Sequence, residues 1–197
     1  MSLVPLALQD EHVALEPLSL DHIEPLERAA ADGELWKLWF TSVPAPGRMR
    51  VYVEAALEVQ AQGHALPFAV RDKGDGVIVG STRFFGFEPE LPRVEIGYTW
   101  YAQSRQRSHV NTACKRLLLM HAFETLKCVA VQFSTDRYNH ASQRAIERLG
   151  AQRDGILRSH RLRADGSVRD SMVYSIIAAE WPTVQAHLEF QLNDKPR

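Results

Sequence analysis

The segment with the clearest potential for ligand chemistry is a polar loop at residues 102–110, which joins a predicted strand to a predicted helix. The N-terminus of a helix offers unpaired N–H groups and a partial positive charge, so it favours an anion. Arginine and glutamine side chains in the loop, among them Gln106 and Arg107, would add donors for a group such as a pyrophosphate. An ordinary polar loop capped by Ser108 or Asn111 explains the same spacing equally well.

Glu95 lies in a predicted strand that also carries an interior glycine. Gly97, within residues 94–101, indicates a bulge or the close approach of another chain or a ligand. Strict alternation divides the strand into two faces, with Val94, Ile96, Tyr98 and Trp100 on one and Glu95, Thr99 and Tyr101 on the other. Glu95 would then face a cleft, or it would be a solvated glutamate on the wet face of a sheet.

A third polar group lies at the start of a short helix that we predict over residues 139–149. Asn139 is a typical N-cap residue, and Ser142 falls in the first turn. A capping role and a ligand-binding role can coexist at these positions.

Several other chemistries are excluded because their motifs are missing. The sequence has no P-loop, no dinucleotide-binding GxGxxG, no GxSxG nucleophile elbow and no zinc-binding HExxH. No two of the eight histidines are three or four residues apart, so we expect no helical metal site. The two cysteines, Cys114 and Cys128, lack a metal-binding spacing and favour a reducing compartment.

The elements that must position these residues fit one domain over residues 1–197, because 45% of the residues are hydrophobic and can form a sizeable core. Segments rich in β-branched and aromatic residues, or alternating in polarity, predict strands at residues 12–16, 66–71, 77–87, 93–101, 129–135, 152–162 and 168–177. A turn at 164–167 joins the last two. Apolar spacing predicts helices after Ser19, at 48–62, 111–127 and 139–149, and from about residue 180.

The charge balance gives no reason to expect nucleic acid or a membrane as a partner. The net charge is −1, from 23 basic and 24 acidic residues. The first ten residues lack the pattern of a secretory signal, and no apolar run approaches the ~20 residues of a membrane-spanning helix. We therefore expect a cytoplasmic protein.

Three motifs in the second half of the chain carry a family resemblance. They are NHASQRAIERLGA at residues 139–151, DGILR at 154–158 and DGSVRDS at 165–171. In this order they resemble the GNAT superfamily of acetyltransferases, and within it the branch of ribosomal-protein N-terminal acetyltransferases of the RimJ/RimL type. The resemblance extends over about residues 12–188, which would form the core of the domain.

The resemblance implies a GNAT fold of the α+β or α/β class, with a mixed central sheet of about six to seven strands, splayed between the fourth and fifth strands and flanked by helices. Acetyl-CoA is the implied co-substrate, without a metal, and its pantetheine arm would enter the splay beside Trp100. Asn139 would hydrogen-bond the arm, and Ser142 would stabilise or protonate the leaving thiolate. The residues implied to bind the pyrophosphate are Gln106, Arg107, Ser108, His109, Val110, Asn111 and Thr112. A homodimer would also be in keeping with the family.

The pyrophosphate loop departs from the family's pattern at two positions. The pattern is Gln/Arg-x-x-Gly-x-Gly/Ala, whereas residues 106–111 are QRSHVN. Glycine lets backbone N–H groups approach a phosphate closely, so His109 is expected to weaken or rearrange the binding loop. Asn111 is a milder replacement, because asparagine tolerates unusual backbone angles.

The implied reaction is acetylation of a primary amine, either a protein N-terminus or a small molecule. The attacking amine must be neutral, and an α-amine with a pKa near ~8 is partly neutral at pH 7 whereas a lysine near ~10.4 is not. Glu95, acting through a water molecule, is the candidate general base.

Acceptor selectivity is expected from two segments. Residues 31–41 contain Trp36, Trp39 and Phe40, and the last predicted hairpin carries Arg158, His160, Arg161 and Arg163. The plainer explanation is that the tryptophans pack in the core or a lid and that the arginines are solvated.

Two other functions are compatible with the sequence. A non-catalytic module that binds or senses acyl-CoA would explain the missing loop glycines, and it would bind without turnover. A nucleic-acid-binding role would rest on the small basic cluster at 158–163, and it would require steeply salt-dependent binding.

Overall fold

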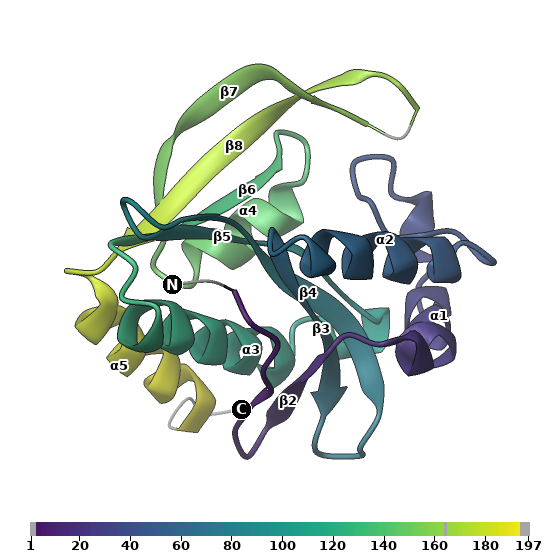
Figure 1. Ribbon diagram of the computed structural model, residues 1–197, viewed down its shortest axis with the longest axis horizontal. Coiled ribbons are helices and arrows are strands. Elements are labelled where there is room, and N and C mark those ends of the chain that lie inside the picture. Colours follow the sequence, from purple (N-terminus) through teal and green to yellow (C-terminus); the bar gives the residue numbers. More distant parts are fainter. Residues whose placement is uncertain (1–2, 164, 194–197) are drawn as a thin grey trace.

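A mixed sheet of eight strands forms the centre of the molecule in the computed structural model, which describes residues 3–163 and 165–193 (Figure 1). In spatial order the strands are β1 (Leu8–Gln9), β2 (Val13–Pro17), β3 (Ala65–Asp72), β4 (Ile78–Glu88), β5 (Arg93–Tyr101), β6 (Ala130–Asp136), β8 (Val168–Ile177) and β7 (Gln152–Leu162). All neighbouring strands are antiparallel except β5 and β6, which are parallel. A parallel pair needs a long crossover connection, and a helix provides it here.

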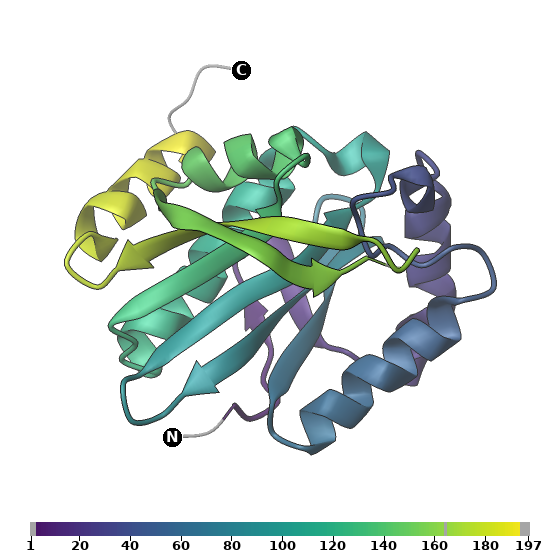
Figure 2. The ribbon, with the colours of Figure 1, turned by 90° about the horizontal axis from the view of Figure 1, so that it is seen from above.

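Helices cover both faces of the sheet. They are α1 (Ile23–Ala31), α2 (Met49–Ala61), α3 (His109–Met120), α4 (His140–Glu147) and α5 (Trp181–Asn193). The first two lie on one face and the last three on the other (Figure 2). Each face therefore has its own hydrophobic core, the larger one beneath α3 and α5 and the smaller one beneath α1 and α2. None of the described helices combines the length and apolar character needed to cross a membrane.

The seven predicted strands are all present, and β5, β7 and β8 have the predicted bounds. The sheet has one strand more than the six to seven expected, because β1 is only two residues long and shows no period in the sequence. In the predicted turn at 164–167, Ala164 lies outside the described residues.

The predicted helix at 111–127 differs from the structure at both ends. It begins at His109, because Ser108 and not Asn111 is the N-cap, and its hydroxyl accepts a hydrogen bond from the Val110 amide. The α-helix ends at Met120 and is followed by a π-helical turn, His121–Thr125. The start of α3 is the end that matters for the site. The first free amides of the helix lie two residues earlier than predicted.

Candidate active site

The strands β5 and β6 pair over only three residues and then separate. Arg93, Val94 and Glu95 lie opposite residues 130–132, and no further pair joins these two fully described strands. The edge of β5 that faces β6 is therefore open from residue 96 to residue 101. The splay that we predicted between the fourth and fifth strands is therefore confirmed. In the structure these strands are β5 and β6, because the short strand β1 adds one to the count.

A β-bulge interrupts β5 beside the opening. Gly97 pairs with Arg83 and Trp100 with Ser81, so β5 has one residue more than β4 between these pairs. Tyr98, within the bulge, has a φ of 50°, which is unusual for a residue other than glycine. The bulge indicated by Gly97 is therefore confirmed, and it leaves peptide groups unpaired next to the splay.

The bulge reverses the alternation of side chains in the second half of β5. Trp100 packs in the smaller core, whereas Tyr101 packs in the larger core and Thr99 points to α3. The predicted division of faces is therefore wrong beyond Gly97, because one extra residue shifts the two-residue period of the strand. Glu95 does not share a face with Thr99 or Tyr101.

Trp100 does not present its indole ring to the opening. Its side chain is buried, and its Nε1 donates a hydrogen bond to the Tyr52 hydroxyl at 3.3 Å. Only the backbone of Trp100 is therefore available at the edge of β5.

A buried lysine of α3 contacts the bulge through threonine hydroxyl groups. Lys115 of α3 donates to the Thr99 hydroxyl at 2.7 Å and to that of Thr82 at 3.4 Å, and Thr99 in turn donates to the Gly97 carbonyl. Burial lowers the pKa of Lys115 from 10.5 to about 8. These contacts connect the long helix to the irregular part of β5.

The loop before α3 holds its polar side chains in different ways. Arg105 pairs with Asp72 and Asp75, so its charge is compensated within the protein. Gln106 donates to the Tyr101 carbonyl at 3.1 Å, which closes the loop. Arg107 is exposed and has a φ of 61°, and it forms no ion pair with the described residues. Of the two loop arginines, Arg107 is therefore the one that no described carboxylate pairs with.

The replacement of glycine by His109 does not distort the start of α3. His109 is the first residue of the helix, and within residues 103–112 only Arg107 has a positive φ. The imidazole Nε2 lies 3.5 Å from Asp72, so the side chain turns toward β3. Thr112, in the same first turn, accepts a hydrogen bond from Arg148 at 2.9 Å. No backbone angle at His109 therefore requires glycine, and the effect of its side chain on pyrophosphate binding stays a prediction.

The start of α4 has the predicted cap. Asn139 is the N-cap, and its Oδ1 accepts a hydrogen bond from the Ser142 amide at 3.0 Å. The Ser142 hydroxyl forms no hydrogen bond within the described part of the chain. Capping uses the side-chain oxygen of Asn139. The side-chain amide nitrogen of Asn139 and the Ser142 hydroxyl are therefore both available to a ligand.

Glu95 is buried at the point where β5 and β6 part. Its side chain is only 11% exposed, it accepts a hydrogen bond from the Ser134 hydroxyl, and its Oε2 lies 3.8 Å from Arg161. Burial raises the pKa of Glu95 above its ordinary value of 4.5, although the Ser134 hydrogen bond and the charge of Arg161 oppose the shift. The solvated glutamate considered as the alternative is therefore wrong, and the side chain has the environment of a general base.

Two residues of this part of the sheet are missing from the predicted site. Ser134 reaches Glu95 from β6, and Arg83 lies on β4 opposite Gly97. A charged residue at the centre of the apolar segment 78–87 is a signal that could have identified Arg83. For Ser134 no local signal exists, because its contact depends on how β5 and β6 are paired.

Aromatic side chains from two distant segments meet near the start of α4. The rings of Trp39 and Tyr138 are 5.6 Å apart, and the guanidinium of Arg163 lies 4.8 Å from the Trp39 ring. Trp39 is 54% exposed, so it is not a core residue. Arg163 also pairs with the buried Asp136 and is not a solvated arginine. Both segments expected to select the acceptor therefore contact one another.

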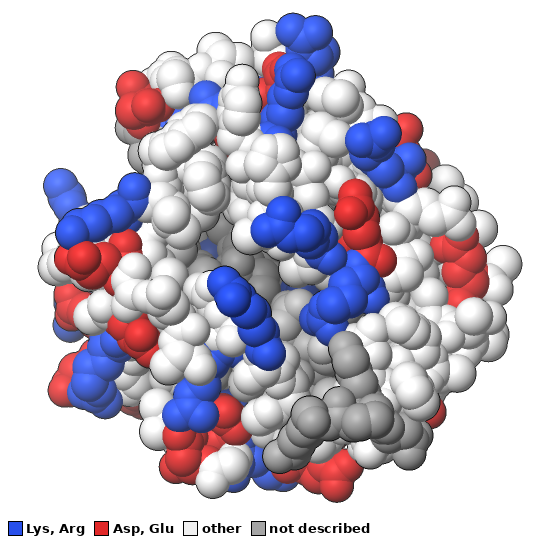
Figure 3. Space-filling view, turned by 180° about the vertical axis from the view of Figure 1, so that it is seen from behind, with Lys and Arg blue, Asp and Glu red and all other residues white. Residues whose placement is uncertain are grey.

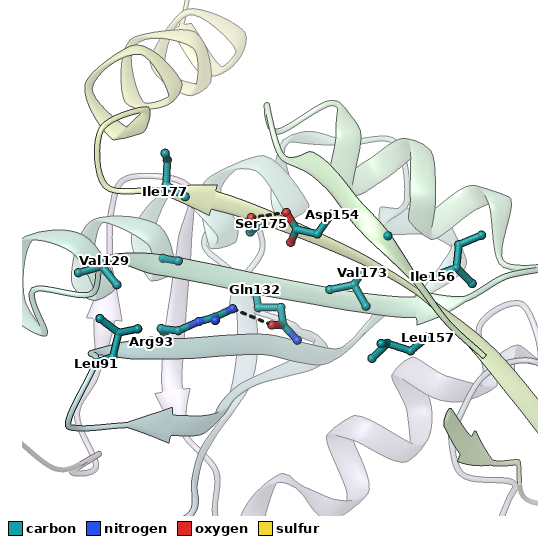
Figure 4. Close-up of a pocket in the computed structure, with 12 residues that line it drawn as sticks. Leu91, Arg93, Val129, Gln132, Asp154, Ile156, Leu157, Val173, Ser175 and Ile177 are labelled. Carbon is teal, nitrogen blue, oxygen red and sulfur yellow. Dashed lines mark hydrogen bonds between the residues drawn. The ribbon is translucent and has the colours of Figure 1, made fainter. Parts of the chain in front are cut away.

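A groove of about 680 Å³ lies on the open face of β5, β6, β8 and β7 (Figure 4). Arg93 donates to Gln132 across it at 3.1 Å, and Gln132 lies opposite Glu95 in the β5–β6 ladder. Most of its other side chains are apolar, namely Leu91, Val129, Ile156, Leu157, Val173 and Ile177. One end of the groove therefore adjoins Glu95.

Basic side chains gather around a central hollow on the face seen from behind (Figure 3). Because the net charge of the chain is only −1, this positive character is local. Among the described residues, no cluster of three or more histidine, cysteine, aspartate or glutamate side chains could hold a metal ion. The site can therefore be described by its proton-transfer groups and its positive charges.

Comparison with known proteins identifies the family. Residues 12–152 match the model of the acetyltransferase (GNAT) domain. A candidate acetyltransferase from T. thermophilus is 37% identical, with coverage of 98% of this chain and 100% of that chain and a TM-score of 0.85. No curated protein matches the chain.

More distant solved structures share the fold. A GCN5-related N-acetyltransferase from Brucella melitensis is 25% identical, with coverage of 98% of this chain and 88% of that chain and a TM-score of 0.89. Mycobacterium smegmatis RimJ in complex with CoA-disulfide is 23% identical, with coverage of 94% and 92% and a TM-score of 0.75. Together with the splayed sheet, these matches show that the chain belongs to the GNAT family and is an acetyl-CoA-dependent N-acetyltransferase.

Proposed function

We propose that this N-acetyltransferase acetylates a primary amine by direct attack in a ternary complex, with a protein N-terminus or a small molecule as the acceptor. The observation that carries the proposal is the position of Glu95, a buried carboxylate at the last paired residue before β5 and β6 separate. When bound, acetyl-CoA supplies the activated acyl group as a thioester. Two substrates held at one opening can react without a covalent enzyme intermediate.

Glu95 takes the proton of the attacking amine, directly or through a water molecule. Its raised pKa makes it a better proton acceptor than an exposed glutamate, and Ser134 holds one carboxylate oxygen in place. A general base in such a position contributes on the order of 10² to 10⁴ in rate.

The cofactor side of the opening offers N–H donors and hydroxyl groups. In our proposal the amides at the start of α3, within residues 106–112, bind the pyrophosphate together with the side chain of Arg107. The free amide nitrogen of Asn139 donates to the pantetheine arm, and the backbone of Trp100 lies beside it. Ser142, whose hydroxyl has no partner within the described residues, protonates the leaving thiolate.

The acceptor reaches Glu95 from the opposite side. The groove that Gln132 helps to line has a volume of about 680 Å³ and can hold more than an amino group, which supports a peptide N-terminus as one acceptor class. RimJ of M. smegmatis shares the fold. An N-terminal amine has a lower pKa than a lysine, so a larger fraction of it is neutral at pH 7. A homodimer stays a prediction, which light scattering of the purified protein would check.

The test is release of free thiol from acetyl-CoA in the presence of a panel of peptides, amino acids and small primary amines. We expect turnover that depends on the amine and yields an N-acetyl product by mass spectrometry. A module that only senses acyl-CoA would bind acetyl-CoA in calorimetry but release no thiol with any amine. That outcome would reject the proposed reaction.

A further inference from the structure

Arg83 is a buried arginine without a carboxylate partner. It is 6% exposed, lies between the buried Thr82 and Phe84, and forms no hydrogen bond or ion pair with a described residue. Its Nε is buried and unpartnered. The guanidinium carbon lies 3.9 Å from the ring centroid of Tyr98 and 5.6 Å from that of Tyr52, and these aromatic contacts compensate the charge only in part.

The position of Arg83 is next to the reaction site. It lies opposite Gly97 in the β4–β5 ladder, at the bulge, and Phe85 two residues further along β4 lies opposite Glu95. Alternation along β4 places Arg83 and Phe85 on the same face of the sheet as Glu95. Arg83 therefore lies two residues along the ladder from the position opposite Glu95, on the face that an acceptor at Glu95 would occupy.

The charges around Glu95 do not balance. Arg161 is compensated by Glu95 and Arg163 by Asp136, at 3.8 and 2.9 Å. Arg169, which is half-buried in the same region, has only the Ser171 hydroxyl as a partner among the described residues. The charges of Asp136 and Glu95 also act on Arg169. Arg83 is therefore a buried positive charge on the acceptor side that forms no ion pair with a carboxylate of the described residues. Because an uncompensated buried charge is costly, such a site favours an anionic ligand.

We propose that the acceptor carries a carboxylate close to its amino group and that Arg83 binds this carboxylate. The inference rests on the proposed function, since it names the acceptor class for the same site. A guanidinium can hold a carboxylate through two parallel hydrogen bonds, which fixes the direction of the amine as well as its affinity. The carboxylate is either the α-carboxylate of a free amino acid or the side chain of an acidic residue near a peptide N-terminus.

Matched acceptor pairs test the inference with the wild-type protein. Thiol release is measured for free amino acids against their α-amides, and for C-terminally amidated peptides that begin Ser-Glu against those that begin Ser-Gln. We expect kcat/KM to be about tenfold or more higher for the carboxylate member of at least one pair. The pair that shows the preference identifies the source of the carboxylate. Equal rates within both pairs would overturn the inference while leaving N-acetylation intact.

The variant Arg83→Met tests the residue itself. We expect KM for the carboxylate acceptor to rise about tenfold, with the KM for acetyl-CoA and the rate with the amide acceptor unchanged. The control is Arg50→Met, which removes an exposed arginine of α2 that pairs only with Glu54. If Arg83→Met does not fold, Arg83→Lys replaces it, because it keeps the charge and loses the two parallel hydrogen bonds. An unchanged preference in the folded variant would contradict our assignment, whereas absence of turnover with every amine would reject the proposed function and the inference with it.

Discussion

The two sides of the opening between β5 and β6 are built in different ways. The cofactor side consists of two short continuous segments, the start of α3 with its loop and the start of α4, and it presents backbone amides and capping residues. The acceptor side brings together side chains from β4, β5, β6 and the β7–β8 hairpin, and most of them are buried. In the proposed site, cofactor binding thus depends on local structure, whereas the chemistry and the choice of acceptor depend on packing.

The two sides also differ in how far their charged groups are exposed to solvent. On the cofactor side Arg107 is exposed, where solvent screens its charge. On the acceptor side Glu95 is buried, and its pKa is raised by loss of solvent. Substitution of Glu95 should therefore change the rate of the chemical step, whereas substitution of Arg107 should change the affinity for acetyl-CoA.

The largest expected effect is that of Glu95→Gln. We expect kcat to fall by about 100-fold, because the amide cannot accept the proton of the amine, while the KM for acetyl-CoA stays within about twofold. Steady-state thiol release with the best acceptor measures both quantities. If turnover is unchanged, Glu95 is not the base and the contrast between the two sides loses its main support.

A smaller effect is expected from Arg107→Ala on the cofactor side. The KM for acetyl-CoA should rise about fivefold with kcat unchanged, and the difference from wild type should shrink as salt is added. Alanine retains the backbone cost of the positive φ, so the comparison isolates the side chain. Arg28→Ala, on the exposed surface of α1, is the matched control. A fall in kcat with unchanged KM would place Arg107 on the chemical side instead.

The pH profile should respond to Ser134→Ala. Activity falls on the acid side as Glu95 becomes protonated, and this limb should lie above pH 4.5 because the pKa of Glu95 is raised. Removing the Ser134 hydroxyl removes a contact that lowers this pKa, so the acid limb should move to higher pH. The measurement is log kcat/KM against pH, with circular dichroism to show that the protein stays folded. A shift to lower pH would contradict the assignment of the limb to Glu95.

The smallest effect is expected from His109→Gly, which restores the residue type of the family's loop. The KM for acetyl-CoA should change by less than about twofold, because His109 already has a helical backbone and its side chain turns toward Asp72. Calorimetric titration with coenzyme A checks the result independently of catalysis. A tenfold gain in affinity would show that the imidazole obstructs the pyrophosphate.

Local patterns predicted most of the fold and part of the site. Strands β5, β7 and β8 have the predicted bounds, and Asn139 is the predicted N-cap of α4, because side-chain period and capping depend on residues close in sequence. The exceptions have physical reasons. The helix α3 begins two residues before the predicted start, because Ser108 is its cap, and the bulge at Gly97 reversed the alternation that follows it.

By itself the sequence determined the order of the elements, the bulge at Gly97 and, through its motifs, the family. Only the tertiary structure decided which side chains surround Glu95, namely Ser134 from β6 and Arg161 from β7. It also decided that Arg83 is buried opposite Gly97 without a hydrogen-bond partner for its Nε among the described residues. The reason is that turns, caps and side-chain periods are set by neighbours in the chain, whereas the burial and charge balance of a carboxylate depend on the register of strands that are far apart in sequence.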